Sequence, residues 1–292
     1  MFARARQKAK LIKAARRAAA CCLAVLTLLA ATGSPAQARR PVQLFAHRGF
    51  TLHQPENSLG ALTAAIDLGL DGSEVDLRTT RDGRIVLLHD AGLERTSNCR
   101  GLVRDMTWEQ VRGCRLRDRQ GRLTGQRVPL LEQALDLVKE RPGFGLALDT
   151  KQADPAKVVR AVVSRGLAGR VRFFVPRTDR VRTVQRLRAL HPGLKVCVDL
   201  SWWWKIEGLP GFVARALKAG SLFSMEWNAS AAGFAEARRA GAGVTMYLWG
   251  DKNLPARALR AARMGATLIS CDRPDQLLPL FRSKPARPAG RQ

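Results

Sequence analysis

Three acidic side chains are spaced so that they could hold a metal ion together. Glu74 and Asp76 lie two positions apart in an apolar run, so in a strand both point to one face while Val75 points to the other. Two carboxylates about 7 Å apart repel unless a cation lies between them, and hard ions such as Ca²⁺ or Mg²⁺ prefer oxygen ligands. Asp149 ends another apolar run and can supply a third oxygen. The alternative is that Glu74, Asp76 or both pair with surface arginines.

Two histidines also follow apolar runs, His47 after residues 42–46 and His89 after residues 84–88. Imidazoles titrate near neutral pH, so a pair of them can serve as general acid and general base. A metal held by carboxylates alone would suit binding, whereas a metal with two histidines suits acid–base hydrolysis. The alternative for either histidine is a structural role, with its ring bonded to the backbone.

Arg48 directly follows His47, and Lys151 lies two positions after Asp149, so both bring positive charge beside these candidates. Cations that converge on a divalent ion indicate an anionic substrate, and phosphate is the natural candidate. The alternative is that both cations only neutralise the neighbouring acids.

The elements that must position these residues follow one repeating pattern. Apolar strand-like runs alternate with amphipathic helix-like segments, and most of the links are short. The runs are residues 42–46, 73–77, 84–88, 145–149, 171–175, 194–199, 222–226, 244–248 and 267–271. About eight such units predict an α/β fold, a (β/α)₈ TIM barrel, rather than an open Rossmann sheet. Catalytic groups of such barrels lie at the carboxyl ends of the strands, so the acids and histidines are expected to meet at one rim.

The N-terminal residues 1–38 have the pattern of a secretory signal peptide. Seven basic and no acidic residues in 1–17 precede a small, apolar stretch at 18–32, and Ala36-Gln37-Ala38 fits a cleavage site. The apolar stretch is short for a membrane anchor, which is the alternative. We therefore expect export, either to the periplasm or out of the cell, and a fall in formal net charge from +26 to +19.

Two later segments interrupt the repeating pattern. Residues 91–130 have little apolar periodicity and are expected to form a small insertion after the second strand region. Residues 283–292 are basic and rich in proline and are expected to be disordered, which gives a barrel domain of residues 39–282. Cys99 and Cys114 lie in the insertion, and an oxidising compartment favours a disulfide between them.

Several motifs along the chain resemble those of the glycerophosphodiester phosphodiesterases. They are A-H-R-G at 46–49, P-E-N-S at 55–58, E-V-D-L-R-T-T-R-D-G at 74–83, H-D-A-G-L-E-R-T at 89–96, L-D-T-K at 148–151 and C-D-R-P at 271–274. The resemblance extends over nearly all of the chain that follows the predicted signal peptide. It implies a TIM barrel and the hydrolysis of a small glycerophosphodiester to glycerol 3-phosphate and an alcohol.

The resemblance also implies a role for each candidate residue. These roles are metal ligands for Ca²⁺ or Mg²⁺ at Glu74, Asp76 and Asp149, an acid–base pair at His47 and His89, and phosphate binding at Arg48 and Lys151. We favour His89 as base and His47 as acid, although the sequence leaves the reverse order open.

Three positions depart from the family's usual pattern. Asp149 replaces a usual Glu, Ser58 replaces a usual Thr, and Tyr247-Leu248-Trp249 stands where a Trp-Thr pair is usual. Spider-toxin-like phospholipases D also carry Asp at the first position and cyclise lysophospholipids, but they lack a large insertion. A phospholipase D-like lyase is therefore one alternative function. A non-catalytic surface-binding barrel is another, and it would be expected to lose a histidine or a metal ligand.

Further contacts to the substrate or to a lipid surface are expected from the other strand ends. The candidates are Trp203 within Trp202–Trp204, Glu226, Tyr247 and Trp249. The Trp202–Trp204 run could instead pack beneath its loop. The positive charge favours attraction to an anionic membrane surface. Dispersed arginines without a recognised binding motif argue against a nucleic-acid binder, and no obligate protein partner is indicated.

Overall fold

The computed structural model of this chain describes residues 42–175, 180–199, 222–226, 234–235, 237, 242–250 and 252–282. The predicted signal peptide, the Trp202–Trp204 run and the predicted tail at 283–292 lie outside these residues. None of the described helices has the length and apolar character needed to cross a membrane.

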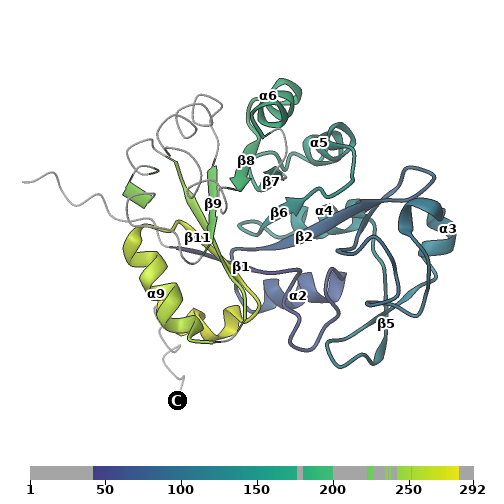
Figure 1. Ribbon diagram of the computed structural model, residues 1–292, viewed down its shortest axis with the longest axis horizontal. Coiled ribbons are helices and arrows are strands. Elements are labelled where there is room, and N and C mark those ends of the chain that lie inside the picture. The colour runs from purple at the N-terminus through teal and green to yellow at the C-terminus, as the bar shows by residue number, and fades with distance from the viewer. Residues whose placement is uncertain are drawn as a thin grey trace, which may run out of the picture. The chain divides into compact units, whose positions relative to one another are not determined.

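Eight parallel strands of the described chain form a closed ring (Figure 1). In spatial order they are β1 (Gln43–Ala46), β2 (Gly72–Thr79), β6 (Gly145–Asp149), β7 (Val171–Val175), β8 (Lys195–Asp199), β9 (Leu222–Glu226), β10 (Val244–Leu248) and β11 (Leu268–Cys271). The ring closes because β1 pairs with β11 on one side and with β2 on the other. This arrangement confirms the predicted (β/α)₈ TIM barrel.

Helices follow most of the strands and pack their apolar faces against the ring. They are α2 (Leu59–Asp67), α4 (Leu131–Lys139), α5 (Pro155–Val163), α6 (Arg180–Leu190), α9 (Leu254–Met264) and, after β11, η3 (Pro274–Gln276) and α10 (Leu278–Phe281). Local signals set several of their ends. Ser58 caps α2 by accepting the Ala61 N–H, and Asp154 caps α5 in the same way with Pro155 in the first turn. The left-handed Gly265 ends α9.

The register between β2 and β6 positions the predicted acidic site. Glu74 lies beside Ala147, and Asp76 lies beside Asp149 on the neighbouring strand. Parallel strands carry their carboxyl ends to the same edge of a sheet, so the end of β6 brings Asp149 next to the pair on β2.

Residues between β2 and α4 form a separately packed segment. Its elements are β3 (Ile85–Leu87), η1 (Val103–Asp105), α3 (Trp108–Val111), β4 (Arg115–Arg117) and β5 (Leu123–Arg127). β3 pairs antiparallel with β2 outside the ring, and β4 and β5 form their own two-stranded sheet. Figure 1 shows α3 and β5 on the side away from α9. The segment has a small apolar cluster of its own, and the predicted disulfide between Cys99 and Cys114 is present.

Candidate active site at the carboxyl ends of the strands

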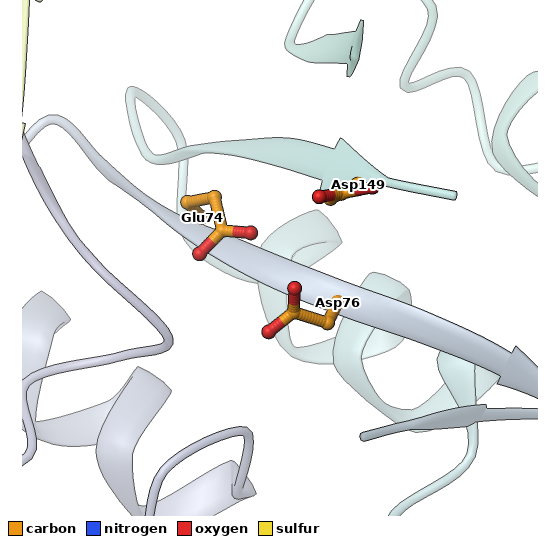
Figure 2. A group of neighbouring side chains, drawn as sticks. All are labelled: Glu74, Asp76 and Asp149. Atoms are coloured by element: carbon orange, nitrogen blue, oxygen red, sulfur yellow. The ribbon is translucent and has the colours of Figure 1, made fainter. Parts of the chain in front are cut away.

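The three predicted metal ligands gather at one point of the barrel rim. Figure 2 shows Glu74 and Asp76 on β2 and Asp149 on the adjacent β6. One carboxylate oxygen of each residue lies within 4.8 Å of the other two. Glu74 and Asp76 are buried, at 4% and 2% exposure. Burial and then the negative charges of Asp76 and Asp149 raise the pKa of Glu74 well above its ordinary value.

Two cations face this acidic group. The Lys151 ammonium lies 2.6 Å from Asp149 and 3.1 Å from Asp76, and Arg48 Nε lies 3.3 Å from Asp76. Burial acts to raise the pKa of Asp76, but the charges of Lys151 and Arg48 outweigh it and the pKa is lowered. Asp76 thus does pair with an arginine, as the alternative for these acids expects, but the pair lies in a buried position at the rim rather than on the open surface.

The donor set fits a hard divalent cation. Glu74, Asp76 and Asp149 carry one more charge than the two side-chain cations beside them can neutralise. Burial makes this extra negative charge unfavourable, and the pKa of Glu74 rises as a result. Carboxylate oxygens are the kind of ligand that Ca²⁺ or Mg²⁺ prefers. Arg48 Nε is buried and makes no hydrogen bond within the described residues, so it remains able to donate to an anion.

A tight turn after β1 directs a backbone N–H towards the acidic group of the rim. Arg48 and Gly49 both have left-handed backbone angles, with φ of 57° and 86°. A Cβ at Gly49 would lie 2.3 Å from the Ala61 Cβ, so only glycine fits. The Arg48 N–H thereby donates to Glu74 Oε2 at 3.1 Å. Lys151 also has a positive φ, of 38°, and strain of this kind in a non-glycine residue is typical of functional sites.

Asn57 of the P-E-N-S motif also holds Asp76 in place, through two hydrogen bonds. Its amide donates to Asp76 Oδ2 at 2.8 Å and accepts the Asp76 N–H at 3.0 Å. Asn57 is buried and left-handed, with φ of 54°, a conformation that asparagine tolerates better than most residues. Asn57 is not among the site residues expected from sequence, although its position in the P-E-N-S motif is a signal that points to it.

His47 lies between an acidic partner and the metal-ligand group. Its Nδ1 is 2.7 Å from Asp272 Oδ1, and its Nε2 is 3.9 Å from Glu74 Oε2. Burial acts to raise the pKa of Asp272, but the hydrogen bond and charge of His47 lower it overall, so Asp272 is a carboxylate at neutral pH. A carboxylate only accepts hydrogen bonds, so Nδ1 carries the hydrogen and Nε2 is left to exchange a proton.

His89 has an equivalent acidic partner. Its Nδ1 lies 2.6 Å from Asp90 Oδ1, and Arg95 Nε donates to Asp90 Oδ2 at 2.5 Å. The hydrogen bond from Arg95 is the main reason that the pKa of Asp90 is lowered to about 2. Arg95 also donates to both oxygens of Glu56, which in turn accepts from Arg48 at 3.1 Å. Charged contacts therefore connect the segment after β3 to the acidic rim.

Two of the predicted aromatic contact residues, Tyr247 and Trp249, lie within the described part of the chain. The Trp249 ring lies 4.2 Å from the His47 ring and 4.9 Å from the Tyr247 ring, and Trp249 is 45% exposed. Trp203 lies outside the described residues, and for Glu226 only the strand that it ends is described. The structure therefore brings Trp249 to His47, and Tyr247 stacks on Trp249.

A closed (β/α)₈ barrel with acids, imidazoles and cations at the carboxyl ends of its strands has the architecture of a TIM-barrel enzyme. The chain matches the model of the glycerophosphoryl diester phosphodiesterase family over residues 47–276 and belongs to that family.

Curated relatives carry similar names. A glycerophosphodiester phosphodiesterase of Bacillus altitudinis is 39% identical over 112 residues, which are 38% of this chain and 46% of that protein. A putative glycerophosphodiester phosphodiesterase of Bacillus subtilis is 31% identical over 159 residues, 53% of this chain and 64% of that protein. The chain thus aligns with between about half and two thirds of the length of these two relatives.

Solved structures share the fold. A glycerophosphodiester phosphodiesterase from Agrobacterium tumefaciens has a TM-score of 0.68 at 25% identity, over 80% of this chain and 97% of that one. An Oleispira antarctica phosphodiesterase in complex with the product sn-glycerol-3-phosphate has a TM-score of 0.66 at 20% identity, over 82% of this chain and 96% of that one.

Proposed function

We propose that this protein is an exported, divalent-metal-dependent phosphodiesterase that hydrolyses glycerophosphodiesters to glycerol 3-phosphate and an alcohol. The observation that carries the proposal is the pair of imidazoles at the acidic rim, each with Nδ1 held by an aspartate. The relatives named above act, by their names, on glycerophosphodiesters, and the Oleispira antarctica protein holds sn-glycerol-3-phosphate.

Glu74, Asp76 and Asp149 would hold a Ca²⁺ or Mg²⁺ ion, which when bound supplies positive charge to the phosphodiester oxygens. Arg48 and Lys151 are poised to bind the same phosphate, because each already lies within ion-pairing distance of the acidic group. Their charges would oppose the negative charge that grows on the phosphate oxygens in the transition state.

The two histidines would move the protons. With Nδ1 bonded to Asp272, His47 presents Nε2 beside Glu74, and we assign it as the acid that protonates the leaving alcohol. His89, held by Asp90, would remove the proton from the nucleophile, either water or the 2-hydroxyl of the glycerol. In the second case a cyclic phosphate forms as the bond to the leaving alcohol breaks, and water then opens this ring to give glycerol 3-phosphate. The aspartates keep each ring in one tautomer and stabilise its protonated form.

Phosphorus NMR on the purified protein tests the assignment directly. Glycerophosphocholine with added Ca²⁺ or Mg²⁺ is expected to give glycerol 3-phosphate, and a chelator is expected to stop the reaction until metal is restored. His47→Ala and His89→Ala should each lower kcat by about 10²–10⁴. A cyclic phosphate as the final product from a lysophospholipid, with glycerophosphocholine left intact, would instead assign the phospholipase D-like reaction.

Export is supported by the composition of residues 1–38 and by the disulfide between Cys99 and Cys114, which suits an oxidising compartment. Expression of the full chain in a bacterial host, followed by intact-mass measurement of the exported fraction, tests this part. A mature chain that starts at Arg39 is expected. Full-length protein confined to the cytoplasmic fraction would contradict export.

A further inference from the structure

A pocket joins the barrel rim to the segment that follows β3. Its volume is about 380 Å³, and both parts of the chain line it. The rim contributes His47, Arg48 and Asp272, whereas the segment contributes Arg95, Arg117 and Arg119 among others. His89 and the predicted metal ligands Glu74, Asp76 and Asp149 are not among the residues that line it. The part of a substrate next to His47 would therefore extend towards the segment.

Arg119 reaches this pocket from a well-ordered turn between β4 and β5. The Asp118 side chain accepts the N–H groups of Gln120 and Arg122, at 3.0 and 2.9 Å, and Gly121 N–H donates to the Asp118 carbonyl. Gly121 has a φ of 78°, which favours glycine. These bonds fix the backbone on either side of Arg119, so the turn holds the point from which its side chain extends beside the pocket.

Neither arginine of the turn forms an ion pair with a described carboxylate. Asp118, which lies between them in sequence and also lines the pocket, pairs with Arg122 instead. Arg117 donates to the carbonyl oxygens of Ser97 and Gly121, at 3.0 and 2.9 Å, which uses two of its five N–H groups and leaves its charge without a carboxylate partner. Arg119 is exposed and makes no hydrogen bond or ion pair with the described residues. By contrast, Arg95 in the same pocket is paired with Glu56 and Asp90.

The positive charge of Arg119 acts on Asp272, the carboxylate that holds His47. Burial acts to raise the pKa of Asp272, but the hydrogen bond and charge of His47 and, more weakly, the charge of Arg119 lower it. Asp272 is the residue that holds His47, so Arg119 faces the side of the site where His47 would protonate the leaving alcohol.

We propose that Arg119, with Arg117 beside it, forms a subsite for an anionic group on the leaving alcohol, so that the enzyme prefers glycerophosphodiesters whose alcohol carries a carboxylate or a second phosphate. The proposal rests on the proposed function and adds the substrate class. Two guanidinium groups that form no ion pair with a described carboxylate can attract an anion into the pocket, and a guanidinium matches a carboxylate or a phosphate with paired hydrogen bonds.

A matched pair of substrates isolates this subsite. Glycerophosphoserine differs from glycerophosphoethanolamine only by a carboxylate on the alcohol. The ratio of their kcat/KM values, measured with metal present, is expected to favour the serine compound in the wild type and to fall about five- to tenfold in Arg119→Gln. Added salt should reduce the wild-type preference, because the subsite is open to solvent. A second pair of substrates, glycerophosphoglycerol with and without a terminal phosphate, tests whether the subsite also favours a phosphate on the alcohol.

Two further variants serve as controls. Arg104→Gln removes an exposed arginine of the same segment that does not line the pocket, and it should keep the wild-type ratio. Arg119→Lys keeps the charge and should keep most of the preference. An unchanged ratio in Arg119→Gln, or an equal fall in Arg104→Gln, overturns the subsite.

The subsite and the proposed function fail in different ways. Cleavage of both substrates with a ratio that is independent of Arg119 contradicts only the subsite. Cleavage of neither by the wild type contradicts the proposed function. In that case calorimetry with O-phosphoserine and phosphoethanolamine tests the subsite without turnover. O-phosphoserine should bind more tightly to the wild type, and Arg119→Gln should remove the difference; equal affinities in the wild type overturn the subsite.

Discussion

The carboxylate of Asp272 lies 2.7 Å from Nδ1 of His47, although 225 positions separate the two residues. Pairing between β1 and β11 brings them together, because the His47 N–H donates to the carbonyl of Cys271 at 3.0 Å just beyond the paired strands. Closure of the barrel therefore selects the tautomer of the histidine. The carboxylate also stabilises the positive charge that His47 carries when it holds a second proton.

Asp272→Asn should consequently impair catalysis more than binding. A neutral amide does not stabilise the imidazolium and can donate to Nδ1, which favours the wrong tautomer. We expect kcat to fall about 10²-fold or more with little change in KM, measured with glycerophosphocholine. Asp275→Asn is the matched control, because Asp275 pairs with Arg273 at 2.7 Å and lies in the next short helix. Equal activity of the two variants would show that Asp272 does not act through His47.

Asp90 should make the stability of the fold depend on pH in the acid range. Its pKa is lowered to about 2, mainly by the hydrogen bond from Arg95, whereas an unfolded aspartate titrates near ~3.9. Because the folded pKa is the lower one, ionised Asp90 stabilises the fold above about pH 4, and this contribution is lost as the pH falls from about 4 towards 2.

Urea unfolding of Asp90→Asn at pH 6 and at pH 3 measures this effect. The variant should be less stable than the wild type at pH 6, by no more than about 1 kcal/mol because the Asp90 side chain is 32% exposed and its partner Arg95 is 48% exposed, and the deficit should shrink at pH 3. Asp105→Asn, which removes an exposed carboxylate 3.7 Å from Arg104, is the control. A deficit that is constant or grows towards pH 3 would contradict this role for Asp90.

The disulfide should stabilise the segment that lines the Arg119 pocket more than it stabilises the barrel. Cys99 and Cys114 close a loop of 15 residues, and the cluster around Cys114 is separate from the main core. Chain entropy predicts a loss of about 3 kcal/mol on removal of such a crosslink. Cys99→Ala/Cys114→Ala should thus be cut faster by proteases within residues 91–130, as read by mass spectrometry of the fragments.

Two comparisons separate the crosslink from packing. Cys99→Ala alone keeps the buried Cys114 side chain, so its protease sensitivity should match that of the double variant if the crosslink is what matters. Reduction of the wild type should have the same effect. Cleavage that begins in the barrel helices would contradict a local role.

The barrel could be predicted from sequence because each ring strand is a short apolar run with a helix or turn signal after it. β3 was the exception: Ile85–Leu87 is as apolar as a ring strand, but it pairs antiparallel with β2 outside the ring. No local property of the run distinguishes the two cases, since its partner is decided by the turn at Asp82-Gly83 that folds it back on β2.

The gathering of the acidic residues was also predictable, because strand ends of a parallel barrel share one rim. The partners of the histidines were not. Asp90 and Asp272 were recognisable as acids at strand ends, but which one holds which ring depends on strand order and side-chain direction. The pair between Glu56 and Arg95 joins residues 39 positions apart across an irregular segment, where no periodicity relates them.

Glu74→Gln should stabilise the metal-free protein while it abolishes metal binding. Burial and the charges of Asp76 and Asp149 raise the pKa of Glu74, whereas an unfolded glutamate titrates near ~4.3. Because the folded pKa is the higher one, the metal-free fold loses stability as the pH rises from about 4.3 through that raised value. A glutamine carries no charge and still accepts the Arg48 N–H that Glu74 accepts at 3.1 Å.

Thermal unfolding in chelator and in excess Ca²⁺ or Mg²⁺ measures both parts. In chelator at pH 8, Glu74→Gln is expected to raise Tm by about 2–4 °C, equivalent to roughly 1 kcal/mol in a chain of this size. In metal, the wild type should gain about 2.7 kcal/mol at a hundredfold excess over Kd, and the variant should gain little. Glu109→Gln, which removes an exposed carboxylate paired with Arg112, should behave as the wild type in both solutions. A variant that is less stable than the wild type in chelator, or equally stabilised by metal, would mean that Glu74 is held by partners other than a cation and that the acidic rim is not a metal site.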